Sequence, residues 1–216
     1  LMIILEDIME QGLFIAFEGI DGSGKSTQID LLGKYLKKMG RDVFVTCEPS
    51  DFRVGKMIRE YLRGEIKGDN RVIAALFVAD RLEHILDENN GMLKKRNEGA
   101  VVLTDRYYFS SYAYQSVDMP MEWIINANSE AAKLMRPDAT IFLDISPEAA
   151  MERIRKGREE TELFENKERL RATRMKYFEA FERMKDSERV EIVDAQRSVE
   201  EIHNDIKNIV KSLLDK

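Results

Sequence analysis

The chain has 216 residues, of which 44% are hydrophobic and 34% are charged, and its formal net charge is −6. Such a composition is typical of one globular domain, and the acidic balance argues against nucleic acid as a partner, because duplex binding needs a basic face. The one cysteine, Cys47, excludes an intramolecular disulfide and a cysteine zinc site, and it favours a reducing cytoplasm.

The first segment, residues 1–12, is apolar enough to be compared with a signal peptide. It has no basic region, Glu6 and Asp7 interrupt its apolar run, and no small-residue cleavage site follows. No later stretch approaches the apolar length that a bilayer-spanning helix needs. We expect a short extension over residues 1–12, a single domain over residues 13–216, and no membrane partner.

Five short apolar runs predict strands, over residues 13–18, 42–47, 100–105, 139–144 and 189–194. Hydrophobic residues at helical spacing predict helices over residues 25–39, 54–62, 70–95, 121–135, 147–156, 166–184 and 198–214. Strands that alternate with helices indicate a parallel sheet covered on both faces. We expect a three-layer α/β fold with a five-stranded parallel sheet, whose ligands bind beyond the carboxyl ends of the strands.

A glycine-rich stretch follows the first predicted strand: residues 17–27 read FEGIDGSGKST, and residues 19–26 match G-x-x-x-x-G-K-[ST]. The glycines let the backbone bring its N–H groups close to an anion, Lys25 can reach terminal phosphate oxygens, and Ser26 can bind Mg²⁺. The nucleotide-binding residues predicted from this phosphate-binding loop (P-loop) are Gly19, Ile20, Asp21, Gly22, Ser23, Gly24, Lys25, Ser26 and Thr27.

Other sequence features disfavour a GTPase. A guanine-binding N-K-x-D motif is missing, since residues 166–169 read NKER, and DRYY rather than D-x-x-G ends the third strand. The P-loop alone does not choose between a kinase and an ATPase.

The P-loop and five later motifs together resemble the thymidylate kinase family. These motifs are CEPSD at residues 47–51, LFVADR at 76–81, DRYYFSSYAYQ at 105–115, RPDATIFLD at 136–144 and VDA at 193–195. The resemblance extends from about residue 13 to the last residues. It implies a P-loop kinase fold with a short helical lid, and transfer of the γ-phosphate of ATP to dTMP with Mg²⁺, giving dTDP and ADP for dTTP synthesis. It also implies a homodimer.

The resemblance implies a role for each matching residue. In the family an aromatic residue at the position of Phe77 stacks on thymine, the arginine matching Arg81 binds its carbonyl, and the tyrosine matching Tyr114 lies under the sugar. The predicted substrate-binding residues are Asp21, Glu48, Phe77, Arg81, Arg106, Ser111, Tyr114 and Gln115, and the predicted metal-binding residues are Ser26, Asp105 and Glu48. From the residues alone, Phe77 also fits a core position beside a solvated arginine, and Asp105–Arg106 also fits a surface ion pair.

Phosphoryl transfer needs positive charge around the migrating group. In this family an arginine comes from the P-loop or from a mobile lid, and Gly22 occupies the P-loop position here. The lid, residues 153–165 (RIRKGREETELFE), therefore has to supply it, although Leu163 stands where the family often has arginine. The predicted catalytic residues are Lys25, Arg106, Arg155 and Arg158, with Arg153 in support. A solvated charged helix is the alternative for this segment.

The loop after the second strand also departs from the family, because CEPSD replaces the bacterial pattern R-E-P-G-G. Binding of the acceptor phosphate is therefore expected to depend more on Arg106, and on Arg59. Two other functions stay open: a kinase of another deoxynucleotide or deoxynucleoside, and a non-catalytic nucleotide sensor. Phe77, Arg81 and Tyr114 favour dTMP over other acceptors, and the basic lid favours a kinase over a sensor.

Overall fold

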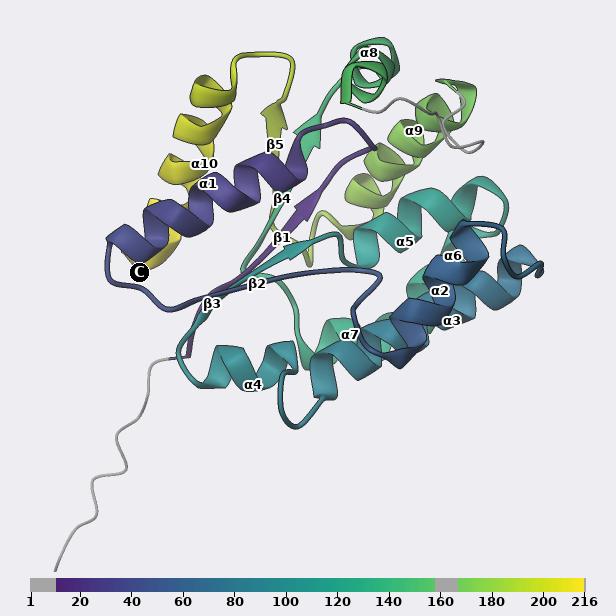
Figure 1. The fold of residues 1–216 in the computed structure, drawn as a ribbon, viewed down its shortest axis with the longest axis horizontal. Helices are drawn as coiled ribbons and strands as arrows, with labels where there is room; N and C mark the ends of the chain where they lie inside the picture. Colours follow the sequence, from purple (N-terminus) through teal and green to yellow (C-terminus); the bar gives the residue numbers. More distant parts are fainter. Residues whose placement is uncertain (1–10, 158–166, 216) are drawn as a thin grey trace, which may run out of the picture.

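Within the described residues, 11–157 and 167–215, five parallel strands form the centre of the computed structural model (Figure 1). They are β1 (Phe14–Glu18), β2 (Val43–Cys47), β3 (Val101–Asp105), β4 (Ala139–Asp144) and β5 (Val190–Asp194), in the spatial order β2-β3-β1-β4-β5. Each predicted strand is confirmed to within one residue. The three-layer α/β fold with its five-stranded parallel sheet is also confirmed.

Strand β1 lies at the middle of the sheet, and its sequence FIAFE is buried throughout. A continuous apolar run is what a parallel strand covered on both faces requires. In the register of the sheet, Phe17 is paired with Asp105 of β3 and with Ile141 of β4. This register brings Glu18, Asp105 and Asp144 to the same carboxyl edge of the sheet.

Two helices, α1 (Lys25–Lys38) and α10 (Val199–Leu214), pack side by side over one face of the sheet (Figure 1). The helices that connect β2 to β3, β3 to β4 and β4 to β5 lie on the other side of the sheet or beyond its carboxyl edge, as right-handed crossovers require. They are α2 (Arg53–Leu62), α3 (Asn70–Leu86), α4 (Met92–Asn97), α5 (Tyr108–Tyr114), η1 (Gln115–Val117), α6 (Met121–Ala127), α7 (Ser129–Leu134), α8 (Pro147–Gly157) and α9 (Lys167–Met184).

Three helix predictions need correction. The single helix expected over residues 70–95 is interrupted between α3 and α4, where the Asp87 carboxylate accepts hydrogen bonds from the backbone N–H groups of Asn89 and Asn90. The helix expected over residues 121–135 is divided at Asn128. Helix α5 was not expected, because nearly all of its residues are buried and it shows no polar face.

Helix α5 is held by an aromatic cluster that joins it to β4 and α9. Phe109 of α5 meets Phe181 of α9 edge to face, with ring centroids 5.1 Å apart, and Phe181 packs in the same way on Phe142 of β4 at 4.9 Å. Such pairs add to the free energy that apolar burial supplies. The cluster fixes α5, which follows directly on the Asp105–Arg106 dipeptide, beside the carboxyl edge of the sheet.

The start of the described chain is tied to the domain, since Gly12 exchanges hydrogen bonds with Arg96 at the end of α4. Residues 1–10 of the predicted extension lie outside the described residues, so the boundary predicted after residue 12 stays a prediction. In the described part of the chain, no helix combines the length and the apolar character that crossing a membrane would require.

Candidate active site

The P-loop turns between β1 and α1 in a conformation that needs glycine. Gly19, Gly22 and Gly24 have φ angles of 145°, 79° and 94°, which residues with side chains rarely adopt. Space is also restricted, because a Cβ atom on Gly22 would lie 2.6 Å from the carbonyl oxygen of Ala150 in α8. The loop therefore presents backbone rather than side chains at the start of α1, where an anion is favoured.

Lys25, the first residue of α1, points back into the loop. It is 6% exposed, and its Nζ donates to the carbonyl oxygens of Gly19 at 3.0 Å and Ile20 at 3.2 Å. Burial, followed by the nearby Arg106 charge, lowers the pKa of Lys25 to about 8. The Ser23 hydroxyl is buried and has no hydrogen-bond partner within the described part of the chain. Both groups suit a phosphate, which accepts hydrogen bonds and favours the charged lysine.

The next two residues, Ser26 and Thr27, have different surroundings. The Ser26 hydroxyl donates to Asp105 Oδ2 at 2.9 Å, whereas Thr27 is exposed. The other carboxylate oxygen of Asp105 is buried without a hydrogen-bond partner among residues 11–157 and 167–215. These residues contain no group of three acidic, histidine or cysteine side chains that could by itself hold a metal ion. One hydroxyl and one carboxylate are enough protein ligands for Mg²⁺, because this ion takes its remaining ligands from phosphates and water.

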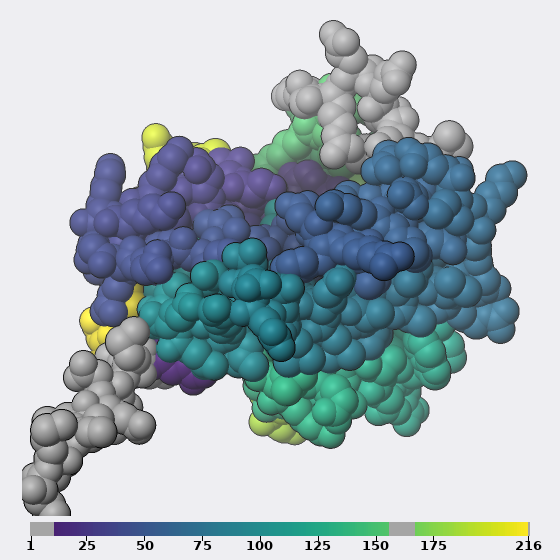
Figure 2. Space-filling model, turned by 60° about the horizontal axis from the view of Figure 1, so that its bottom comes forward, coloured from purple at the N-terminus to yellow at the C-terminus, as the bar shows by residue number. Residues whose placement is uncertain are grey.

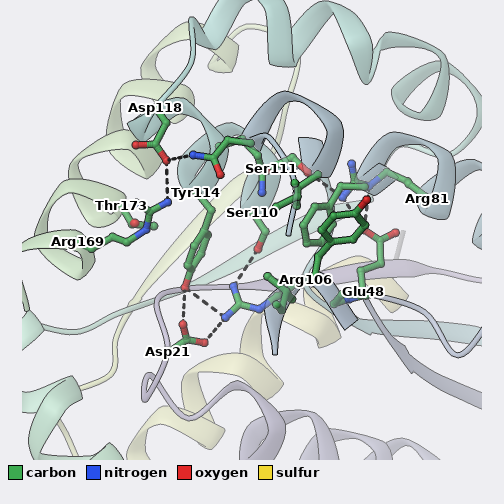
Figure 3. A pocket seen from close by; sticks show the side chains of 18 of the residues that line it. Asp21, Glu48, Arg81, Arg106, Ser110, Ser111, Tyr114, Asp118, Arg169 and Thr173 are labelled. Carbon is green, nitrogen blue, oxygen red and sulfur yellow. Dashed lines mark hydrogen bonds and ion pairs between the residues drawn. The ribbon is translucent and has the colours of Figure 1, made fainter. Parts of the chain in front are cut away.

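A cavity of about 540 Å³ opens beside the P-loop (Figure 3). It is bounded by residues from the P-loop, the loop after β2, α3, α5 and α9. All eight residues that the sequence predicts to bind the substrate line it: Asp21, Glu48, Phe77, Arg81, Arg106, Ser111, Tyr114 and Gln115. Residues scattered over nearly a hundred positions therefore border one space.

At the P-loop side of this cavity, Arg106, Asp21 and Tyr114 form one cluster. Arg106 Nη2 lies 2.5 Å from Asp21 Oδ1, and the Tyr114 hydroxyl donates to Asp21 Oδ2 at 3.1 Å (Figure 3). The Arg106 guanidinium also lies over the Tyr114 ring, 4.9 Å from its centroid. Burial alone would raise the pKa of Asp21, but Arg106 and Lys25 lower it below its ordinary value. Asp21 is thus ionised at neutral pH and pairs with Arg106.

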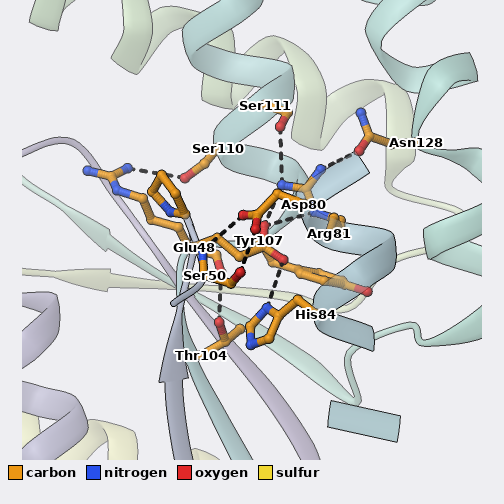
Figure 4. A network of polar contacts seen from close by, with 12 residues as sticks. Glu48, Ser50, Asp80, Arg81, His84, Thr104, Tyr107, Ser110, Ser111 and Asn128 are labelled. Carbon is orange, nitrogen blue, oxygen red and sulfur yellow. Dashed lines mark hydrogen bonds and ion pairs between the residues drawn. The ribbon is translucent and has the colours of Figure 1, made fainter. Parts of the chain in front are cut away.

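Arg81 and Glu48 form a second, fully buried pair (Figure 4). Arg81 Nε and Nη2 lie 2.9 and 2.6 Å from Glu48 Oε2, and Nη2 also reaches the Ser111 hydroxyl at 3.2 Å. The Asn128 side chain accepts from Arg81 Nη1, and His84 lies 3.3 Å from the other Glu48 oxygen. Glu48 therefore faces Arg81 rather than the Ser26–Asp105 pair, and a metal-binding role for it stays a prediction.

The loop that carries Glu48 is held by α3. Ser50, at a position where the family pattern has glycine, donates from its backbone N–H to Asp80 Oδ2 at 2.9 Å and from its hydroxyl to Oδ1 at 2.5 Å. Arg59 also supports this loop, because its guanidinium donates to the Pro49 carbonyl oxygen and to Asp51. Arg59 does not line the cavity.

The three arginines predicted to act from the lid have different positions. Arg155 on α8 is exposed, and Arg158 lies outside the described residues. Arg153, predicted only to support the others, donates to the carbonyl oxygens of Ser23 in the P-loop at 3.4 Å and Ala195 after β5 at 2.7 Å. Arg153 thus joins α8 to two loops at the carboxyl edge of the sheet.

Some polar residues of the site carry no motif of their own. Asn128 and Tyr177 come from segments predicted only to be helices. The Asn128 side chain accepts a hydrogen bond from Arg81, and the Tyr177 hydroxyl donates one to Glu18. Arg169 of α9 lines the cavity and donates to Asp118 at 2.9 Å. Ser110, which binds Arg106 at 3.1 Å, could have been suspected from its place beside Ser111 in the DRYYFSSYAYQ motif.

Comparison with known proteins identifies the family. The thymidylate kinase family model matches residues 17–206. Proteins named probable thymidylate kinase from Pyrococcus abyssi and Methanocaldococcus jannaschii are 39% and 40% identical, over 93% and 95% of this chain and 97% and 99% of theirs. A protein named thymidylate kinase from Symbiobacterium thermophilum is 38% identical over 94% of each chain. The chain belongs to the thymidylate kinase family.

Proposed function

We propose that this protein transfers the γ-phosphate of ATP to dTMP and releases ADP and dTDP. The proposal rests on the contact between the P-loop, the predicted site for ATP, and the cavity, the predicted site for dTMP. Asp21 and Arg106 lie at the junction of the P-loop with the cavity, so a donor phosphate in the loop and an acceptor phosphate in the cavity would meet there. Close approach of the two reactants supplies much of the catalysis in such transfers.

On the donor side, the P-loop N–H groups and Lys25 would bind the β- and γ-phosphates. Ser26 and Asp105 would hold Mg²⁺. This ion would neutralise the negative charge that develops on the phosphate oxygens. An oxygen of the dTMP phosphate forms the new bond to the γ-phosphorus, and the bond to the bridging oxygen of ADP breaks. Lys25 and lid arginines would stabilise the transferring group, and a closed lid would exclude water as a competing acceptor.

On the acceptor side, Arg106 would bind the dTMP phosphate, with Asp21 and Tyr114 next to the sugar and Phe77 against the base. Arg81 has five N–H groups, and its four contacts with Glu48, Ser111 and Asn128 within the described residues use four of them. One N–H on Nη1 is then left for a thymine carbonyl. The exocyclic amino group of cytosine could not accept it, which favours thymine.

We also propose a cytoplasmic homodimer. Helices α2 and α3 lie side by side on one face (Figure 2). They also expose apolar side chains, with Met57 39%, Val72 47% and Leu86 51% exposed. An exposed apolar surface is typical of a protein interface. The single cysteine supports a reducing compartment.

The test is an ADP-release assay with ATP and Mg²⁺ against dTMP, dUMP, UMP, dCMP, AMP and thymidine. We expect strong turnover with dTMP, weaker turnover with dUMP and almost none with UMP, because the Tyr114 ring leaves no room for a 2′-hydroxyl. Preferred turnover of another acceptor would overturn the assignment of the cavity to dTMP. ATP binding without turnover of any acceptor would instead favour a nucleotide sensor.

A further inference from the structure

Glu18, the last residue of β1, is a buried carboxylate to which the proposed reaction gives no role. It is 0% exposed, lies at the carboxyl edge of the central strand, and does not line the cavity. Taking an ionised carboxylate out of water costs several kcal/mol unless donors replace the water. The contacts of Glu18 therefore show what this carboxylate does in the fold.

Four donors surround the Glu18 carboxylate, and they come from the residue before α5, from α5 and from α9. Oε1 accepts from the backbone N–H groups of Tyr107 at 2.9 Å and Ser110 at 3.0 Å. Oε2 accepts from the Ser110 hydroxyl at 2.6 Å and the Tyr177 hydroxyl at 2.8 Å. Burial raises the pKa of Glu18 above its ordinary value, although these hydrogen bonds and the Arg106 charge oppose the shift.

These contacts enclose Arg106 from two sides. Tyr107, whose N–H Glu18 binds, is the next residue after Arg106, which has a φ of 73° and is the only described non-glycine residue with positive φ. The Arg106 guanidinium can only donate, so the Ser110 hydroxyl accepts from Arg106 Nη1 at 3.1 Å while it donates its one proton to Glu18 (Figure 3). Glu18 thereby acts on both the backbone and the guanidinium of Arg106.

We propose that Glu18 is a positioning residue, which orients Arg106 toward the acceptor phosphate through the Ser110 hydroxyl and the Tyr107 backbone. This inference rests on the proposed function, because it assigns the acceptor phosphate to Arg106. Glu18 touches neither reactant, and its effect is on the binding of dTMP rather than on the binding of ATP.

The first test is the variant Glu18→Gln, which keeps the size of the side chain but offers one acceptor oxygen in place of two. Two of the four donors then lose their acceptor. If the amide nitrogen takes the place of Oε2, the Ser110 hydroxyl no longer donates to residue 18. We expect kcat/KM for dTMP to fall at least 10-fold, mainly through KM, while KM for ATP changes less than 3-fold.

Glu188→Gln is the matched control. Glu188 is also buried and accepts from a tyrosine hydroxyl, that of Tyr108, but it neither contacts Arg106 nor lines the cavity. Its substitution also changes a buried carboxylate to an amide and should leave both KM values within 2-fold. If both variants lose dTMP and ATP affinity to the same extent, Glu18 is a structural residue only and the proposal is wrong.

A double-mutant cycle with Ser110→Ala tests the route, because coupled residues give non-additive effects. We expect Glu18→Gln to add less than 3-fold to the loss in kcat/KM for dTMP once Ser110 is alanine. Additive losses would overturn the coupling. Tyr177→Phe serves if Glu18→Gln does not fold. It removes one donor to Glu18 and a hydroxyl 2.9 Å from that of Ser110, but it keeps the bond from Ser110 to Glu18, so a smaller rise in KM for dTMP is expected.

Wild-type turnover separates this inference from the proposed function. Absence of dTMP turnover by the wild type would contradict the function itself. Normal wild-type turnover together with an unchanged KM for dTMP in Glu18→Gln would contradict only the role of Glu18.

Discussion

Arg106 combines an unfavourable backbone with several polar contacts. A left-handed φ costs a residue with a side chain about 1–2 kcal/mol, and here it is maintained by hydrogen bonds from Arg106 N–H to Phe17 O and from the Thr104 hydroxyl to Arg106 O. Backbone strain of this kind gathers at functional sites. The conformation places the guanidinium between Asp21, Ser110 and the Tyr114 ring.

At the residue scale we predict that Arg106→Lys is not conservative. A lysine cannot bind Asp21 and a phosphate with a planar fork, so about 2–3 kcal/mol of acceptor binding should be lost, or roughly 30- to 150-fold in kcat/KM for dTMP. Steady-state kinetics would measure this loss, and calorimetry should show that ATP affinity changes less than 3-fold. Near-native turnover of dTMP by the variant would contradict the role of Arg106 as the acceptor clamp.

The lowered pKa of Lys25 predicts that ATP binding takes up protons. With a pKa of about 8, roughly half of the Lys25 side chains are neutral at pH 8. Bound phosphates favour the charged form and raise the pKa, so ATP binding at pH 8 should take up about half a proton. Calorimetry in buffers of different ionisation enthalpy measures this uptake.

The uptake should decline as the pH falls to 7, where the free lysine is already mostly charged. Lys25→Met should abolish it. Uptake that persists in Lys25→Met would assign the proton to another group.

At the scale of elements, α8 carries two arginines with different surroundings. Arg153 already binds the P-loop and the loop after β5, whereas Arg155 is exposed. An exposed arginine in the predicted lid is available for the transferring phosphate once the lid closes. The two side chains should therefore affect different steps.

We predict that Arg155→Ala lowers kcat by about 10- to 1000-fold with little change in ATP affinity, because a contact made only in the transition state does not contribute to binding. Arg153→Ala should instead weaken ATP binding. Single-turnover kinetics and equilibrium binding separate the two effects, with Arg41→Ala as a control on an exposed arginine after α1. A kcat unchanged in Arg155→Ala would leave Arg158 as the candidate.

At the scale of the whole molecule, the exposed apolar side chains of α2 and α3 predict self-association. A charge at Met57 or Val72 would be buried without a partner in the proposed interface, so Met57→Glu or Val72→Glu should yield a monomer. Light scattering after size exclusion measures the mass. Met175→Glu is the control, because Met175 is 65% exposed on α9, apart from these helices. A monomeric wild type would contradict the homodimer.

Much of this molecule could be predicted from local sequence. The five strands follow from apolar runs bounded by polar residues. The P-loop follows from the spacing of its glycines, which adopt the positive φ angles that the loop requires. The breaks in two predicted helices do not follow from hydrophobic periodicity, because Asp87 and Asn128 are compatible with a helical period. Asp87 caps the following backbone, and Asn128 turns its side chain to the buried Arg81.

The sequence by itself determined the sheet and the phosphate-binding loop, because motifs and periodicity are properties of neighbouring positions. Its resemblance to the thymidylate kinase family indicated eight of the residues that line the cavity. Tertiary structure alone decided how those side chains pair. Glu48 faces Arg81, Asp21 faces Arg106, and Glu18 accepts from Tyr177, which is 159 positions away. A buried charge must find its partner wherever the fold brings one, and that partner depends on packing between elements distant in the chain.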